Sequence, residues 1–427
     1  MEESKKTGTI SVLGAASLGV GSMVGAGIFA LLGEAGAIAG TATYLSFLIG
    51  GIVALSSGYS YAKLGSKFPS SGGVIEYLFR GFGKNTLSAS FSVLFLIASI
   101  ISMSMVSKTF GSYARSLITV EPSKLLENGF TSLIVIIFVG LNFVGSKVVS
   151  KAESVIVIIK LIILLTFMVA GLDYVNWNEF STTGYPAATN IFGSLAITYF
   201  AYTGFSVITN TAGDMANPSK QLPKAIFLAI GFTIILYVGL SLVVFGNLSV
   251  SDVIKYKETA LAEAAMPIFG TIGFVVISIA ALLSTSSSLN ANMFSVLNMS
   301  KQESQEGEIS VLFMRKIWKQ GTDGLLIIAI IILLMANFLD LTAIASLGSI
   351  ATLLVTMTVH IGHYKIINET KASKAGVLFA IFSNLAAVVL FFAYIIKQGQ
   401  TTTLVMISVL LLFCFLFERF YLKKKIQ

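Results

Sequence analysis

The sequence is poor in charged residues and nearly devoid of cysteine. Of its 427 residues only 11% are Asp, Glu, Lys or Arg, whereas about a quarter are charged in soluble globular proteins. The one cysteine, Cys414, excludes a disulfide framework and a cysteine-rich metal site. Apolar residues make up 55% of the chain and form stretches long enough to cross a hydrocarbon slab of about 30 Å. The composition therefore predicts an all-α polytopic membrane protein.

Twelve apolar segments have the length and hydropathy of membrane helices. The first, from about residue 10 to 39, is too long for a signal-peptide core and has no convincing cleavage site, so we expect a membrane helix of the mature protein. The segments are centred near Val24, Leu55, Leu96, Phe138, Ile163, Thr198, Ile235, Ile279, Ile331, Leu353, Leu385 and Leu411. Their connections are short, so we expect a single transmembrane domain over residues 1–427.

The basic residues predict the orientation. The net charge of +8 comes from short clusters between apolar segments, so it does not indicate a nucleic-acid partner. Most of the 28 Lys and Arg residues lie on one side of a twelve-helix arrangement, among them Lys63, Lys220 and Lys424. By the positive-inside rule we expect both termini in the cytoplasm and the protein in the plasma membrane.

Two apolar segments contain interruptions. The first has Gly19, Gly21, Gly25 and Gly27 within nine residues, which is poor helix-forming sequence. The alternative is a small-xxx-small contact between helices through Gly21 and Gly25. The sixth segment has a polar, glycine-containing centre at residues 199–206. Two interruptions five segments apart indicate an inverted repeat, in which broken helices offer backbone N–H and carbonyl groups to a substrate such as an amino acid zwitterion.

Four motifs resemble one transporter family. They are Val-Gly-Ala-Gly-Ile-Phe at 24–29, the stretches 61–64 and 68–73, Phe-Ala-Tyr-Thr-Gly-Phe at 200–205, and Asn-Pro-Ser-Lys-Gln-Leu-Pro-Lys-Ala-Ile at 217–226. In this order and spacing they are similar to the amino acid, polyamine and organocation (APC) superfamily, in its proton-coupled amino acid permease branch. The resemblance implies a LeuT-type five-plus-five inverted repeat with broken helices 1 and 6. The repeats would cover about 10–172 and 189–366, with two additional helices at about 373–421.

The resemblance also implies a substrate site between the two interruptions. Its first-helix wall would be Met23, Val24, Gly25, Ala26 and Gly27. Its sixth-helix wall would be Phe200, Ala201, Thr203, Gly204 and Phe205. Phe200 would cap the bound substrate. Without the motif it would be read as an ordinary lipid- or core-facing phenylalanine.

Lys160 lies in the middle of the fifth segment, with five apolar residues on either side. A charge at this depth costs roughly 2.5–3.5 kcal/mol, so we favour a functional over a purely structural lysine. Such an amine can gain and lose a proton as a cavity opens to either side. By resemblance, it would occupy the place of the cation site of sodium-coupled members, with the Gly21 carbonyl and the hydroxyls of Ser286 and Ser287 as neighbours.

These features predict a secondary transporter, not an enzyme, with the proton as coupling ion and no cofactor. Ser206 stands where acid-resistance exchangers have a glutamate, and no acidic residue lies mid-span near the site, so a neutral or small amino acid is the expected substrate. The alternative is a sodium-independent amino acid exchanger; a channel is a second rival. His360 and His363 are expected to be an interfacial pair without metal. The amino acid preferred and the oligomeric state stay open.

Overall fold

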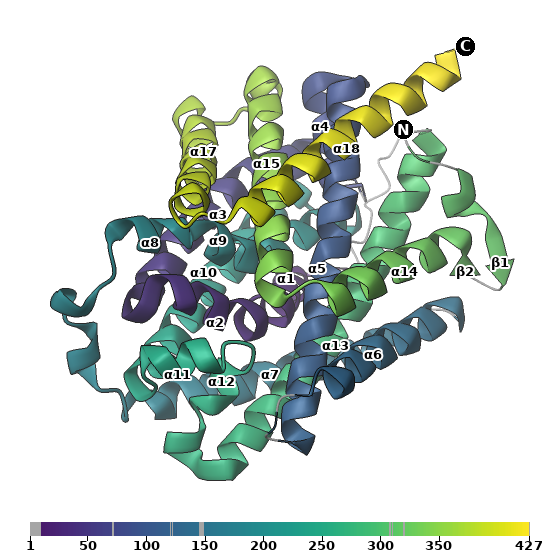
Figure 1. Cartoon of the computed structure of the whole chain (residues 1–427). Helices are drawn as coiled ribbons and strands as arrows, with labels where there is room; N and C mark the ends of the chain where they lie inside the picture. The colour runs from purple at the N-terminus through teal and green to yellow at the C-terminus, as the bar shows by residue number, and fades with distance from the viewer. Residues whose placement is uncertain are drawn as a thin grey trace.

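The computed structural model describes residues 10–70, 72–119, 121, 123–144, 149–306, 309, 311–318 and 321–426. Nearly all of them are helical (Figure 1). The α-helices are α1 (Val12–Ala26), α2 (Ile28–Ala39), α3 (Thr43–Lys67), α4 (Val74–Phe82), α5 (Thr86–Ile118), α6 (Lys124–Val144), α7 (Val149–Leu172), α8 (Ala188–Gly193), α9 (Leu195–Tyr202), α10 (Pro218–Asn247), α11 (Val250–Lys255), α12 (Ala260–Glu263), α13 (Met266–Glu306), α14 (Asp323–Phe338), α15 (Leu341–Lys365), α16 (Ile367–Thr370), α17 (Lys374–Lys397) and α18 (Thr401–Ile426).

Short elements connect these helices. The 3-10 helices are η1 (Gly40–Ala42), η3 (Trp177–Phe180), η4 (Thr182–Gly184), η5 (Thr203–Asp214) and η6 (Val311–Met314). Strands β1 (Lys316–Trp318) and β2 (Gly321–Thr322) pair antiparallel between α13 and α14 and lie at the edge of the molecule (Figure 1).

The helices have the dimensions of membrane spans. In the described part of the chain, ten helical segments are long and apolar enough to cross a bilayer, and two apolar helices, Val12–Gly25 and Asp323–Phe338, are shorter. The short ones fall at the first and ninth predicted segments. One is short because the first segment is divided at Gly27, so that its second half, α2, continues toward α3. The structure thus confirms a polytopic helical membrane protein, while the count of twelve spans stays a prediction.

Helix α1 lies in the interior of the bundle (Figure 1). It contacts α10, α13 and η5, and also α2, α5, α7 and α9. Burial differs strongly between spans: 83% of the residues in the most apolar window of α15 are buried, but only 17% in that of α18. Consequently α15 belongs to the protein core, and α18 faces the lipid over most of its surface.

Candidate functional site

The first interruption consists of a single residue. Gly27 separates α1 from α2, its N–H donates to the Met23 carbonyl at 2.7 Å, and its own carbonyl accepts from Leu31 at 2.8 Å. A Cβ on Gly27 would overlap the Tyr237 hydroxyl and lie 2.7 Å from the Ala201 carbonyl oxygen. The glycine is therefore needed because α9 and α10 approach the backbone of α1 so closely, and in this conformation its N–H is already bonded.

The second interruption lies at the junction of α9 and η5. After Tyr202 the chain continues as a 3-10 helix for twelve residues, whereas 3-10 runs longer than three or four residues are uncommon. A Cβ on Gly204 would lie 2.6 Å from the Met23 nitrogen and 2.8 Å from the Ser22 carbonyl carbon. The α9–η5 junction thus packs directly on the backbone of α1, about one turn before Gly27.

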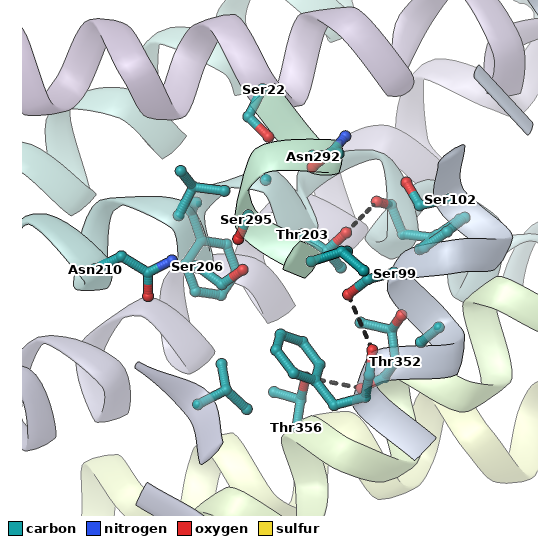
Figure 2. A pocket seen from close by; sticks show the side chains of 18 of the residues that line it. Ser22, Ser99, Ser102, Thr203, Ser206, Asn210, Asn292, Ser295, Thr352 and Thr356 are labelled. Atoms are coloured by element: carbon teal, nitrogen blue, oxygen red, sulfur yellow. Dashed lines mark hydrogen bonds between the residues drawn. The ribbon is translucent and has the colours of Figure 1, made fainter. Parts of the chain in front are cut away.

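A cavity of about 80 Å³ lies beside the second interruption (Figure 2). At roughly 10–15 Å³ per water-sized probe, it holds about five to eight water-sized atoms. Its polar lining residues are Ser22, Ser99, Ser102, Thr203, Ser206, Asn210, Asn292, Ser295, Thr352 and Thr356, together with the tyrosines Tyr61 and Tyr199. Among the described residues that line it there is no Asp, Glu, Lys, Arg or His. The cavity is therefore polar but uncharged.

The structure brings half of the predicted substrate residues to the cavity wall. Phe200, Ala201, Thr203, Gly204 and Phe205 all line it. From α1, Ser22 lines the cavity, whereas the described residues Met23, Val24, Gly25 and Gly27 do not; the side chain of Ala26 lies outside the described part of the structure. The ring of Phe200 packs against Gly348 of α15, where a Cβ would lie 2.6 Å from the ring Cζ.

The hydroxyl groups of Ser99 from α5 and Thr356 from α15 were not predicted, whereas that of Thr203 was. The Ser99 hydroxyl donates to the Phe95 carbonyl at 2.9 Å, that of Thr203 to the Phe200 carbonyl at 2.8 Å, and that of Thr356 to the Thr352 carbonyl at 2.8 Å (Figure 2). A hydroxyl has one proton and two lone pairs. With their protons used inside the helix, these oxygens can still accept, which suits a donor such as an ammonium group.

Helix α7 turns Lys160 toward the inside of the protein. Its exposed apolar residues, including Val155, Ile158 and Ile162, follow the helical period on the opposite face, whereas Lys160 is fully buried. The Lys160 Nζ donates to the Gly21 carbonyl of α1 at 2.9 Å. The lysine therefore bonds to the glycine carbonyl that the sequence analysis named as its neighbour.

The hydroxyl run of α13 lies on a helix that contacts both α1 and α7. Ser284 donates to the Val24 carbonyl at 3.4 Å. Ser287 is buried and Ser286 is half-buried on the same helix. Side chains from α7 and α13 thus bind two carbonyls of α1 immediately before the Gly27 interruption.

The histidines, predicted to form an interfacial pair, lie near the end of α15, and their position relative to the membrane interface stays a prediction. His360 and His363 are fully buried, because α3, α16 and α17 cover this part of α15. His363 bonds to Ser60 at 2.7 Å through Nδ1 and to Thr370 at 2.8 Å through Nε2. Among the described residues there is no cluster of three or more potential metal ligands.

An ionic contact between α2 and the connection from α11 to α12 was also missed. Glu34 is only 2% exposed and lies 3.2 Å from the Lys257 Nζ. The Lys257 Nζ donates to the Thr342 hydroxyl at 2.6 Å, which in turn donates to Glu34 at 2.7 Å. A Cβ on Gly33 would overlap the Lys257 carbonyl. The connection between α11 and α12 is therefore closely packed on α2.

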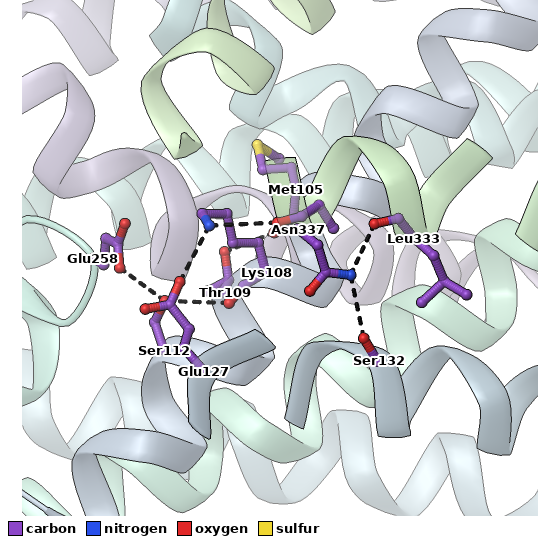
Figure 3. A network of polar contacts seen from close by, with 10 residues as sticks. Met105, Lys108, Thr109, Ser112, Glu127, Ser132, Glu258, Leu333 and Asn337 are labelled. Carbon is purple, nitrogen blue, oxygen red and sulfur yellow. Dashed lines mark hydrogen bonds and ion pairs between the residues drawn. The ribbon is translucent and has the colours of Figure 1, made fainter. Parts of the chain in front are cut away.

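A second polar network joins α5, α6 and α14 (Figure 3). Lys108 forms an ion pair with Glu127 at 3.2 Å and donates to the Ala336 carbonyl at 3.4 Å. Nearby, Ser112 donates to Glu258 at 2.8 Å. The network fixes α6 and α14 to the long helix α5, and none of these residues lines the cavity.

Comparisons with known proteins agree with this architecture. Residues 10–416 match the model of the family described as amino acid permease. The chain is 35% identical over 399 residues to the inner membrane transport protein YbaT of Escherichia coli (strain K12), covering 93% of this chain and 92% of that protein. It is 26% identical over 370 residues to the methylthioribose transporter of Bacillus subtilis (strain 168), with coverages of 81% and 78%. The serine/threonine exchanger SteT of the same organism is 27% identical over 293 residues, with coverages of 67% and 66%.

Proposed function

The chain belongs to the amino acid permease family, and on this basis we propose that it imports small neutral amino acids together with protons by alternating access. The observation that carries the proposal is the buried Lys160 amine on the Gly21 carbonyl, next to the two helix interruptions. A proton gained or lost there changes a bond to α1, the helix on which the substrate region is built. Proton binding and substrate binding then act on the same helix.

The cavity supports a small neutral substrate. Its volume of about 80 Å³ suits alanine or serine better than a long side chain, and the described lining residues include no charged side chain to neutralise a cationic or anionic substrate side chain. Hydroxyl oxygens of Ser99, Thr203 and Thr356 would accept from the substrate ammonium. For residues 23–27 to offer a free backbone N–H to the substrate at Gly27, the Gly27 N–H would have to leave the Met23 carbonyl.

The fold proposed for this activity is the LeuT-type arrangement of twelve spans. Its repeats are residues about 10–172 and 189–366, followed by helices at about 373–421. In the proposed orientation both termini lie in the cytoplasm of the plasma membrane. The contact of α1 with the α9–η5 junction supports this arrangement, because broken helices of inverted repeats meet at the substrate site.

In the same orientation, the cavity lies nearer the cytoplasmic side. Helix α13 begins beside α12, and α15 begins at Leu341, close to the Glu34–Lys257 ion pair. The cavity extends away from that end, toward Gly72, Asn210 and Met299. The end with α11 and α12 is thus packed shut, and the cavity lies toward the proposed cytoplasmic side.

The test is transport in sodium-free proteoliposomes with an inward proton gradient. The native protein should accumulate labelled alanine above equilibrium, and Lys160→Ala should abolish accumulation. The exposed lysine variant Lys397→Ala is the matched control and should transport like the native protein. If the native protein only exchanges internal for external amino acid, the symport proposal is wrong and the protein is an exchanger. SteT, a relative named as an exchanger, makes this the second candidate.

A further inference from the structure

A chain of buried polar groups connects the cavity wall to His360. Tyr199, which lines the cavity, donates its hydroxyl proton to the Ser57 hydroxyl oxygen at 3.2 Å. Asn384 of α17 donates to the same oxygen at 3.0 Å, and the Nε2 of His360 lies 3.1 Å from it. All four side chains are fully buried. Ser57 is therefore the meeting point of α3, α9, α15 and α17.

The hydrogen-bond capacity of Ser57 determines the state of the histidine. A hydroxyl accepts two hydrogen bonds and donates one. The Tyr199 hydroxyl and the Asn384 amide fill both acceptor positions, and the amide orientation is fixed because its nitrogen also donates to the Ala380 carbonyl at 2.9 Å. The Ser57 proton must then go to His360. Nε2 is an acceptor, so the neutral ring carries its proton on Nδ1.

A second proton on His360 would break this arrangement. An imidazolium donates from both nitrogens, so its Nε2–H would need a lone pair of Ser57 that Tyr199 or Asn384 now occupies. Asn384 is held by its own helix, whereas Tyr199 lies at the cavity wall, where a bound substrate can accept from its hydroxyl. The hydroxyl that is released is therefore that of Tyr199.

We infer that His360 is a second proton-binding residue, separate from Lys160, whose protonation frees the Tyr199 hydroxyl to donate to the carboxylate of a substrate in the cavity. The inference rests on the proposed function, because it needs an amino acid in the cavity. Thermodynamic linkage makes the two effects reciprocal. Protonation of His360 raises the affinity for the substrate by some factor, and bound substrate raises the proton affinity of His360 by the same factor. His360 is a positioning residue that acts through Ser57 and Tyr199.

The surroundings of His360 leave it able to take up this role. Tyr61 of α3 meets its ring edge-on, with centroids 5.9 Å apart, and His363 is one turn along α15. Lys63 interacts electrostatically with His363. In the described part of the chain, no carboxylate acts on His360, and its Nδ1 has no hydrogen-bond partner. Burial disfavours a second proton on this ring, so the inference requires the substrate carboxylate, reached through Ser57 and Tyr199, to supply the compensating negative charge.

The chain has only two histidines, so their protonation can be observed directly. In ¹⁵N-histidine His363→Gln protein in liposomes, the single signal comes from His360. Solid-state NMR should show the neutral ring protonated on Nδ1. Saturating alanine should raise the pH at which the ring becomes doubly protonated by about one unit, equivalent to about tenfold in affinity. Adding Tyr199→Phe should abolish this shift.

The reciprocal variant His360→Gln is the matched control, because it reports His363 alone. His363 bonds to Ser60 and Thr370, not to Ser57, so alanine should leave its titration unchanged. A ring protonated on Nε2, or a titration of His360 that bound alanine does not move, overturns the inference while the transport proposal stands. If ¹³C-alanine does not bind at all, both the proposed substrate and the linkage are wrong.

Discussion

Glu34 and Lys257 form an ion pair that joins α2 to the connection between α11 and α12, with 3.2 Å between the carboxylate and the ammonium group. Thr342 at the start of α15 bonds to both. The glutamate is buried and the lysine side chain is 33% exposed, so breaking the pair leaves a buried carboxylate without its cation. This contact stabilises the conformation in which the α11–α12 end is closed.

Lys257→Met should therefore open that end more often. Partial exposure reduces the cost of losing the pair to about 1–2 kcal/mol, or about fivefold to thirtyfold in the equilibrium between the closed and open states. A reporter cysteine, Ser22→Cys at the cavity, in a Cys414→Ser background, should react that much faster with an impermeant thiol reagent added from outside. Adding Glu34→Gln should restore slow labelling, and an unchanged rate in Lys257→Met would refute this role.

Gly25 packs against Ser288 so closely that a Cβ would overlap the serine Cβ and lie 3.0 Å from the Ser284 carbonyl oxygen. Gly25→Ala should cost about 1–3 kcal/mol of stability through overpacking and should slow alanine uptake. Ser288→Gly in the same chain should restore part of the stability and part of the uptake rate, because it removes the overlapping carbon.

Gly231→Ala on α10 is the control. Nothing lies within 4 Å of the Cβ position of Gly231, so the thermal unfolding temperature and the uptake rate of this variant should match or slightly exceed the native values. Equal behaviour of the two alanine variants would contradict the prediction.

Ala98 is a small residue of α5 at the cavity wall. Ala98→Leu adds three carbon atoms to a space of about 80 Å³, so larger amino acids should be excluded before smaller ones. Competition between labelled alanine and unlabelled valine should show the preference for alanine rising at least about tenfold. Ser102→Ala, which removes a hydroxyl without filling space, should leave the size preference unaltered. If Ala98→Leu weakens the binding of alanine and valine equally, Ala98 does not limit substrate size.

The parts of the site that the sequence predicted are those with a local signal. A lysine among isoleucines and a glycine beside polar residues in an apolar segment stand out wherever the neighbouring helices lie, so Lys160 and the α9–η5 junction were found. Ser99 and Thr352 were missed because a hydroxyl in a membrane helix usually bonds to its own backbone, and only the rotation of α5 and α15 turns these residues to the cavity.

Long-range packing explains the remaining differences. Glu34 lies in the apolar run of α2, and its partner Lys257 comes from a connection whose position no local pattern reveals. His360 and His363 lie near the end of α15, where the sequence predicts an interface. They are buried because α3 and α17 extend alongside and supply Ser57, Ser60 and Asn384.

Helix α14 has consequences for the surrounding lipid. Its 16 residues rise about 24 Å at 1.5 Å per residue, which is less than the roughly 30 Å of an average hydrocarbon core. Asn337, near its end, is held by Ser132 of α6 at 3.2 Å, so the helix cannot shift freely to compensate. A span shorter than the hydrocarbon core is accommodated by a locally thinner bilayer, so we expect uptake to depend on the acyl-chain length of the surrounding lipid.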